Sequence, residues 1–183
     1  MLLQWMDKTW RPHGNFADIL DVPFEDLHAA GYRLIMLDID NTLVPHGSDQ
    51  PDARACGSVA RIAAAGLSCI VVSNAGSSRS RRFSDRLGVE CLAYAGKPSP
   101  RGVLEACRRK QVDPSRAALI GDQLFTDMAA ARRAGSAAIR VSPISPHEPP
   151  HVRLKRLFER LLARRYRLAA TYLDLPLHKD GVG

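Results

Sequence analysis

The chain has 183 residues, 45% of them hydrophobic and 25% charged, and a formal net charge of +7. These values are typical of one soluble globular domain with a full hydrophobic core, and they exclude a chain that is disordered over most of its length. No apolar run approaches the ~20 residues that a membrane-spanning helix needs, so the sequence predicts no membrane-spanning helix.

The first residues and the cysteines indicate the compartment. Residues 1–14 lack the basic and long apolar regions of a secretory signal. Cys56, Cys69, Cys91 and Cys107 show neither CxxC pairing nor the spacing of zinc ligands. We therefore expect reduced structural thiols in a cytoplasmic protein.

Short apolar runs alternate with helical patterns from residue 33 to residue 141. The pattern predicts strands at 33–37, 66–74, 91–95, 117–122 and 137–141. Helices are predicted between them, at 51–65, 78–89, 99–112 and 125–135. This alternation is typical of an α/β fold in which helices cover both faces of a Rossmann-like, doubly wound parallel sheet. Ligands of such sheets bind at the carboxyl ends of the strands.

Polar side chains follow four of the predicted strands at these ends. They are Asp38 and Asp40, Ser73 and Asn74, Lys97, and Asp122 and Asp127, in the order of the strands. Each alone has an ordinary explanation as a turn former, a solvated loop residue or a helix cap. Because the carboxyl ends of parallel strands share one edge of the sheet, the whole set indicates a site.

Four stretches carry a family resemblance. "DIDNTLV" (38–44), "SN" (73–74), "KP" (97–98) and "GDQLFTD" (121–127) resemble the four motifs of the haloacid-dehalogenase superfamily of phosphohydrolases, in their usual order. Together with "KTWRP" before the first strand, the residues of these motifs resemble those of the small capless IIIA phosphatases of that superfamily. That group includes phosphatidylglycerophosphate phosphatases. The resemblance implies a phosphatase built on a Rossmann-like core.

The paired acids indicate the reaction. A phosphomonoester carries about two negative charges near neutral pH, so a carboxylate attacks it only beside a compensating cation. Asp38 is the expected nucleophile, which forms an aspartyl-phosphate. Asp40 is expected to protonate the leaving alcohol and then to activate water. The resemblance implies that dehalogenases of the superfamily keep no acid at this second position, so Asp40 favours phosphoryl transfer.

Mg²⁺ is the expected cofactor, because it prefers hard oxygen ligands. The expected metal ligands are Asp38, the main-chain carbonyl of Asp40 and Asp122, with Asp127 acting from further out or through water. Ser73 and Lys97 are expected to hold the phosphoryl oxygens, with help from main-chain amides near Asn41 and Asn74. The full predicted set of phosphate-binding residues is Asn41, Thr42, Ser73, Asn74 and Lys97.

The spacing of the motifs indicates an open site. In this superfamily a cap domain inserted after the first or second motif usually selects the substrate. Here 35 positions separate Asp38 from Ser73 and 24 separate Ser73 from Lys97, which leaves room for one helix and one strand in each gap. We therefore expect no cap domain and a bulky phosphorylated substrate, such as a phospholipid, a nucleic-acid end or a phosphoprotein.

The basic charge lies in the C-terminal part. A Pro-rich linker at 143–151 divides a phosphatase domain, 1–150, from a tail, 151–183, that holds 8 Lys and Arg against 3 Asp and Glu. Residues 152–168 predict an extra amphipathic helix with Leu154, Leu157, Phe158, Leu161 and Leu162 on one side. Two interpretations stay open: the apolar side packs on the core, or the helix contacts an anionic membrane, at its inner face, as a peripheral protein.

Other readings of the chain remain. Arg79, with Arg81 and Arg82, either meets a second anionic group of the substrate or is solvated at the start of a helix. The same catalytic residues also suit a phosphatase of soluble metabolites or nucleic-acid ends, although an aromatic content of 6% does not favour nucleic-acid binding. A non-catalytic binding or regulatory module is a further alternative, which the intact acidic residues and Lys97 disfavour.

Overall fold

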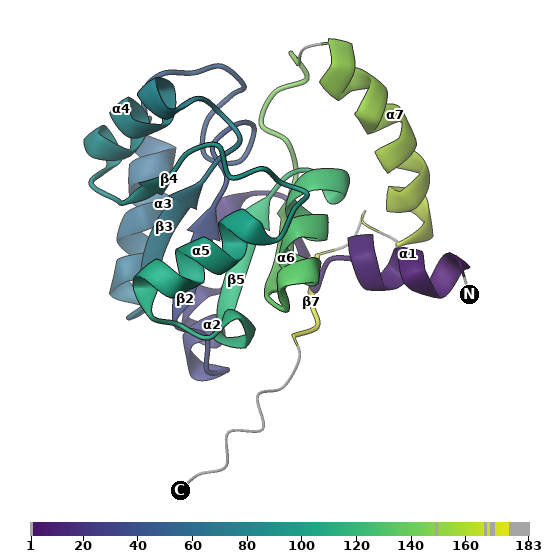
Figure 1. Ribbon diagram of the computed structural model, residues 1–183, viewed down its shortest axis with the longest axis horizontal. Coiled ribbons are helices and arrows are strands. Elements are labelled where there is room, and N and C mark those ends of the chain that lie inside the picture. The colour runs from purple at the N-terminus through teal and green to yellow at the C-terminus, as the bar shows by residue number, and fades with distance from the viewer. Residues whose placement is uncertain (1, 149, 167, 169–170, 176–183) are drawn as a thin grey trace, which may run out of the picture.

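A seven-stranded sheet forms the centre of the computed structural model, which describes residues 2–148, 150–166, 168 and 171–175 (Figure 1). The strand order is β4-β3-β2-β5-β6-β1-β7. All neighbours run parallel except β1 and β7, which pair antiparallel. The strands are β1 (Gly14–Phe16), β2 (Leu34–Leu37), β3 (Ser68–Val72), β4 (Cys91–Leu92), β5 (Ala117–Gly121), β6 (Ala137–Val141) and β7 (Tyr172–Leu173).

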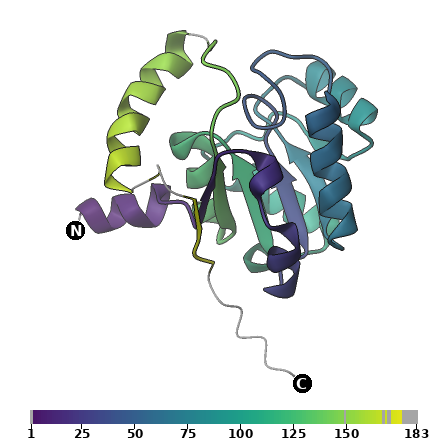
Figure 2. The ribbon, with the colours of Figure 1, turned by 180° about the vertical axis from the view of Figure 1, so that it is seen from behind.

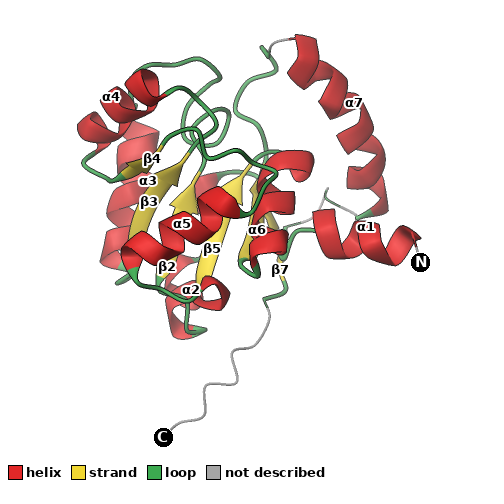
Figure 3. Ribbon diagram, viewed as in Figure 1, coloured by secondary structure: helices red, strands yellow, loops and turns green. Residues whose placement is uncertain are grey.

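Helices cover both faces of the sheet, as Figure 3 shows by colour. The α-helices are α1 (Leu2–Trp10), α2 (Phe24–Ala29), α3 (Ala53–Ala64), α4 (Ser77–Leu87), α5 (Arg101–Lys110), α6 (Ala129–Ala134) and α7 (Pro150–Arg165). Two short 3₁₀ turns, η1 (Ile19–Asp21) and η2 (Pro114–Arg116), and a π-helical turn, η3 (Leu124–Met128), complete the described elements. None of the described helices is both long and apolar enough to cross a bilayer.

The central strands are apolar at every position because both of their faces are covered. Side chains alternate across a strand, so in β2 Ile35 packs with the cluster beneath α2, α3 and α4, whereas Met36 packs with the cluster beneath α5 and α6. Figures 1 and 2 show α5 and α6 on one side of the sheet and α3 on the other. The predicted α/β fold with a Rossmann-like parallel sheet is confirmed.

The boundaries differ from the sequence prediction in places. The strand predicted at 137–141 forms over those residues, but the strand predicted at 91–95 is reduced to Cys91–Leu92. The helix predicted at 125–135 begins as the π-helical turn η3. Strands β1 and β7 and helices α1 and α2 were not predicted, because each is short and its position depends on tertiary pairing. Strand β7 adds an antiparallel edge to a sheet predicted to be parallel.

The exposure of side chains in α7 contradicts, in part, the interpretation that the apolar side of this helix packs on the core. Leu162 is buried, as packing on the core predicts. The other four members of the predicted apolar side, Leu154, Leu157, Phe158 and Leu161, are 55–63% exposed. The expectation that this side covers the core is therefore wrong for these four residues. The inward face of α7 is instead built from Val152, Glu159 and Leu162, together with the half-buried Arg156.

Candidate active site

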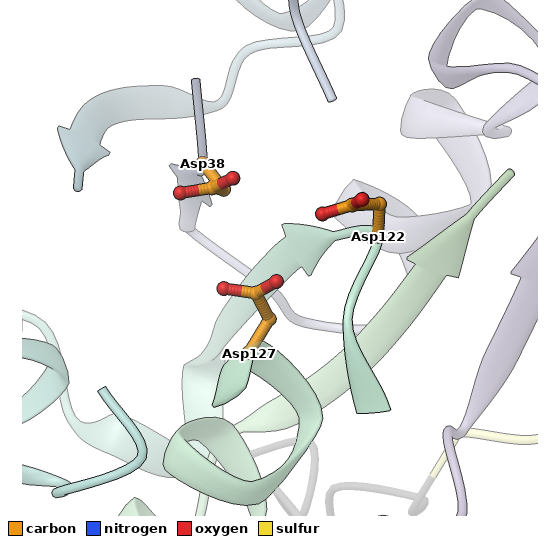
Figure 4. Close-up of side chains that lie close together, drawn as sticks. All are labelled: Asp38, Asp122 and Asp127. Carbon is orange, nitrogen blue, oxygen red and sulfur yellow. The ribbon is translucent and has the colours of Figure 1, made fainter. Parts of the chain in front are cut away.

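Three carboxylates meet at the carboxyl ends of β2 and β5, where the strand order changes direction. Asp38 follows β2, Asp122 follows β5, and Asp127 comes from η3. One oxygen of each lies within 4.8 Å of the others, and all three residues are buried (Figure 4). The predicted gathering of acidic side chains at this edge is therefore present in the structure.

A glycine and a π-helical turn bring Asp127 into this cluster. A Cβ atom on Gly121, the last residue of β5, would lie 2.4 Å from Cγ of Asp127, so only glycine leaves room for that carboxylate. The widened turn η3 is closed by the Met128 amide, which donates to the Gln123 carbonyl over 3.2 Å, and a π-helical turn of this kind is frequent at functional sites. Asp127 Oδ2 accepts from the Gln123 amide, which fixes its orientation.

Lys97 bridges two of the three acids. Its Nζ atom lies 2.6 Å from Oδ1 of Asp38 and 2.6 Å from Oδ1 of Asp127. The Asn74 side chain donates to the Lys97 carbonyl and accepts from the Lys97 amide, each over 2.9 Å. Asn74, predicted to contribute to phosphate binding, thus positions the main chain of Lys97.

Burial dominates the electrostatics of the cluster. It raises the pKa of Asp38 to about 7, because Lys97 offsets only part of the cost of ionising a buried carboxyl beside Asp127. Burial also raises the pKa of Asp122, against the opposing effect of a nearby arginine. Burial alone would lower the pKa of Lys97, but its two carboxylate partners outweigh that effect and raise it. The site is therefore crowded with negative charge that a further cation would stabilise.

Asp40 pairs with Arg79, which lies at the start of α4. The Arg79 guanidinium donates to both carboxylate oxygens, over 2.7 Å and 2.8 Å, and the Gly47 amide donates over 2.8 Å. Burial would raise the pKa of Asp40, but these hydrogen bonds outweigh it and hold the pKa below its ordinary value. His46 Nδ1 lies 3.5 Å from Asp40 Oδ1. Sequence reasoning named Arg79 but did not find that it pairs with Asp40.

Arg156 of α7 reaches the cluster from the far end of the chain, and sequence reasoning missed this role. Its guanidinium contacts the Asp122 carboxylate and donates to the Asp122 carbonyl over 3.0 Å. The same group pairs with Glu148 at 2.8 Å and with Glu159 at 2.9 Å. The one sequence signal near it is Glu159, the single acidic residue of a basic helix; the structure shows that Glu159 is buried, and a buried acid needs a partner.

The remaining predicted residues lie around the same strand ends. Asn41 adopts φ 60°, which asparagine tolerates better than most residues, and its side chain donates to Glu148 over 2.7 Å. Its amide donates to the Val44 carbonyl inside the turn. Thr42 is buried, and its hydroxyl has no partner among the described residues. Ser73, also buried, accepts from the Ala75 amide.

The donor set fits a divalent cation. Asp38, Asp122 and Asp127 supply carboxylate oxygens close enough to share one ion. Asp122 Oδ1 is buried, and it has no hydrogen-bond partner among the described residues although Arg156 contacts Oδ2. Because an unpaired buried carboxylate oxygen is costly, it fits a position for a metal ligand.

A family model for haloacid dehalogenase-like hydrolases matches residues 24–135, more than half of the chain. The chain belongs to this family. The match spans α2 to α6 and so includes every strand end that carries a predicted site residue. The assignment of the chain as a hydrolytic enzyme is thereby confirmed.

Two curated proteins are similar in sequence. The probable phosphatase YqeG of Bacillus subtilis is 28% identical over 155 residues, which cover 85% of this chain and 90% of that protein. The glyceraldehyde 3-phosphate phosphatase of Methanopyrus kandleri is 40% identical over 59 residues, which cover 32% of this chain and 23% of that protein.

Solved structures share the fold. A HAD-superfamily hydrolase from Ehrlichia chaffeensis has a TM-score of 0.51 at 14% identity, over 70% of this chain and 97% of that one. The cobalt-bound deoxy-D-mannose-octulosonate 8-phosphate phosphatase of Haemophilus influenzae has a TM-score of 0.50 at 14% identity, over 75% of this chain and 91% of that one. At these identities the likeness supports the fold.

Proposed function

We propose that the chain is a Mg²⁺-dependent phosphatase that hydrolyses a phosphomonoester through an aspartyl-phosphate on Asp38. The observation that carries the proposal is the contact of Asp38 with Lys97 inside a buried cluster of three carboxylates. The lysine supplies positive charge beside the attacking oxygen, and phosphate is stabilised where cationic donors converge. The similarity to a probable phosphatase over most of the chain supports the same reaction.

The reaction then follows in two steps. An Asp38 oxygen attacks phosphorus, and the bond between phosphorus and the leaving oxygen breaks as Asp40 donates a proton to that oxygen. Asp40, now ionised, takes a proton from water, which attacks the aspartyl-phosphate and releases inorganic phosphate and the Asp38 carboxylate. Arg79 holds Asp40 ionised in the free site, so a bound phosphate that competes for Arg79 would free Asp40 to carry its proton.

Asp38, Asp122 and the main-chain carbonyl of Asp40 would hold the Mg²⁺, and Asp127, which lies in the same cluster and pairs with Lys97, would act on the ion through water. When bound, the ion supplies positive charge that neutralises the phosphoryl oxygens. Lys97 and the Ser73 hydroxyl orient the same oxygens, with Asn41, Thr42 and Asn74 shaping the loops around them. The phosphatase of similar fold from Haemophilus influenzae is described as cobalt-bound, so this fold is compatible with a divalent ion.

We propose a bulky substrate. Phosphatidylglycerophosphate is the candidate, because the chain resembles the capless IIIA phosphatases, a group that includes phosphatidylglycerophosphate phosphatases. The segments after the first and second motifs hold only α3 with β3 and α4 with β4 as regular elements, which supports the proposal of a capless, open site. The exposed apolar and basic side chains of α7 favour a phospholipid at the inner face of an anionic membrane, with the protein cytoplasmic and peripheral. A soluble phosphorylated metabolite or a nucleic-acid end is the second candidate, because the same catalytic residues serve it.

A turnover assay on a small soluble phosphomonoester tests the reaction. We expect hydrolysis with Mg²⁺, none after chelation, and none for Asp38→Asn, whose amide is a poor nucleophile and a poor metal ligand. Asp40→Asn should lower kcat by roughly 10²–10⁴-fold, the usual contribution of a positioned proton donor. Full turnover in excess chelator, or substantial activity of Asp38→Asn, would refute the mechanism.

A substrate panel separates the two candidates. Phosphatidylglycerophosphate in mixed micelles is compared with sugar phosphates, nucleotides and 5′-phosphorylated DNA at equal concentrations. We expect the largest kcat/KM for the phospholipid. A larger value for any soluble phosphate would replace the phospholipid by that class while leaving the reaction unchanged.

A further inference from the structure

Helix α7 presents an apolar stripe to solvent, apart from the buried side chains that attach the helix to the core. The stripe consists of Leu154, Leu157, Phe158 and Leu161, which are 60%, 56%, 55% and 63% exposed. Their spacing of three and four residues places them on one face of the helix. At 3.6 residues per turn, Leu161 lies about half a turn around the helix from the buried Val152. Four large apolar side chains in a row on one exposed face indicate an interaction surface.

The orientation of α7 is fixed by polar contacts on the inward face. Arg156 contacts Asp122 and pairs with Glu148 and Glu159, and Glu159 accepts from the Phe125 amide over 3.1 Å. Arg165 pairs with Asp7 of α1 at 3.0 Å, at the other end of the helix. These contacts hold the stripe outward, at the edge of the molecule where Figures 1 and 2 show α7.

The charges around the stripe have one sign. Its neighbours Arg153, Lys155, Arg160 and Arg164 are exposed, and we call these four residues the basic flank. Glu159 is the one acidic residue of the α7 sequence, and it is buried against Arg156. The outward face of α7 is therefore apolar along its centre and cationic beside it, which is the pattern of helices that lie in an anionic lipid interface.

The stripe continues toward the active site. A cavity of about 1350 Å³ lies against α7, and its lining includes Leu154, Leu157 and Arg156 of the helix and Glu148 of the segment before it. Arg156 contacts Asp122, and Glu148 accepts from Asn41, so this cavity adjoins the catalytic strand ends. A surface bound along the stripe would lie at the entrance of that cavity.

We propose that the stripe and the basic flank of α7 dock the enzyme on an anionic lipid bilayer. A second copy of the chain fits this face less well, because two stripes placed together would bring two basic flanks into contact, whereas anionic headgroups beside acyl chains match both features. The biological role of this docking rests on the proposed function, since docking would bring a phospholipid substrate to Asp38. The docking itself needs no turnover and is measured separately.

Vesicle sedimentation of the full chain tests the proposal. Vesicles of phosphatidylcholine alone are compared with vesicles that also contain phosphatidylglycerol, at low and at high salt. We expect sedimentation with the anionic vesicles only, weakened by salt. The inactive Asp38→Asn chain should sediment equally well, because docking does not use the nucleophile. Equal binding to neutral and anionic vesicles, or no binding, would overturn the proposal.

Paired variants assign the binding to α7. The stripe variant carries Phe158→Gln and Leu161→Gln, and the flank variant carries Lys155→Gln and Arg164→Gln; these exposed positions are distant from the cluster around Asp38 in the chain and do not line the cavity. Each variant should bind anionic vesicles at least about tenfold more weakly than the natural chain. Hydrolysis of a small soluble phosphomonoester should stay unchanged in both.

The matched controls lie on other surfaces. Arg81→Gln with Arg82→Gln removes two exposed charges from α4, and Leu104→Gln removes an exposed apolar side chain, 43% exposed, from α5. Both should bind vesicles like the natural chain. Equal losses in the α4 control and the flank variant would overturn the assignment to α7. So would a dimer in light scattering that the stripe variant abolishes, or capture by an acidic protein without vesicle binding. Vesicle binding without phosphatase activity would support docking and refute the proposed function.

Discussion

Arg79 holds Asp40 through both carboxylate oxygens, with Nη1 2.7 Å from Oδ2 and Nη2 2.8 Å from Oδ1. A paired arginine of this kind stabilises the ionised carboxylate, whereas the proposed general acid must carry a proton when the leaving group departs. The two requirements conflict in the free site. The pairing therefore makes the protonation of Asp40 depend on what else binds Arg79.

The pH dependence of kcat/KM should report this pairing, because it reflects the free enzyme. Arg79 lowers the pKa of Asp40, so the protonated fraction falls at a lower pH than for an unpaired carboxyl. In Arg79→Gln that pKa rises, and the alkaline limb of the profile should move to higher pH. Arg81→Gln, an exposed change on the same helix, should leave the limb in place. A limb that stays fixed or moves to lower pH in Arg79→Gln would contradict the role of Asp40.

Gly121→Ala should lower the activity by displacing Asp127, although residue 121 itself does not contact the substrate. The added Cβ would lie 2.4 Å from Asp127 Cγ and 2.6 Å from its Cβ, so η3 must shift to accommodate it. Because a displacement of about 1 Å in a catalytic group is costly, we expect kcat to fall about 10²-fold. Steady-state kinetics at saturating Mg²⁺ measure it.

Gly57→Ala is the matched control for that change. Nothing lies within 4 Å of a Cβ at this position in α3, so alanine should raise the free energy of unfolding by about 0.5–1 kcal/mol and leave kcat unchanged. Normal kcat in Gly121→Ala would show that the placement of Asp127 matters little.

The parts of the fold that the sequence predicted are those set by local patterns. The apolar run at 33–37 forms β2 because it is buried on both faces, and the helix predicted at 78–89 forms as α4, which ends at Gly88 in the left-handed conformation. The sequence did not predict which face of α7 packs on the core, because the apolar side of an amphipathic helix ordinarily faces the core. Here the ion pairs of Arg156 hold a different face of the helix against the core. Asp122, a partner of Arg156, lies 34 positions earlier in the chain, so no local pattern indicates the contact.

The same limit applies to the site. The spacing of the motifs placed Asp38, Lys97 and Asp122 at strand ends, and the parallel sheet brought them together. Nothing local links Arg79 to Asp40, which is 39 positions away, or Glu148 to Asn41, which is 107 positions away. Side-chain pairs that join distant loops depend on the finished fold, so periodicity and turn signals do not reveal them.

Arg156→Gln should destabilise the whole domain. Its side chain is 12% exposed, and its guanidinium pairs with Asp122, Glu148 and Glu159. Removing one partner from a buried ion network leaves uncompensated charge. We expect the free energy of unfolding to fall by about 3 kcal/mol, measured by urea denaturation at neutral pH. Arg153→Gln, an exposed change on the same helix, should alter it by less than about 0.5 kcal/mol. Equal stabilities of the two variants would mean that the network around Asp122 contributes nothing.

His13 should make the stability fall in mild acid. Its Nδ1 accepts from the Ala138 amide over 3.0 Å, so that nitrogen carries no proton, and burial beside Arg132 lowers the pKa of His13 to about 4. Between that value and the ordinary value near 6.5, the unfolded chain takes up a proton that the folded chain refuses. The free energy of unfolding therefore decreases as the pH falls through this window, and the contribution is fully present only above it.

The expected loss from His13 alone is about 2 kcal/mol at most between about pH 7.5 and about pH 5, by linkage between the two pKa values. Urea denaturation at both pH values measures it. His13→Gln has no group that titrates there, so its stability should change less across the same interval. His147→Gln, at an exposed position, should keep the full dependence of the natural chain. If His13→Gln loses as much stability in acid as the natural chain does, then His13 does not remain neutral in the folded protein.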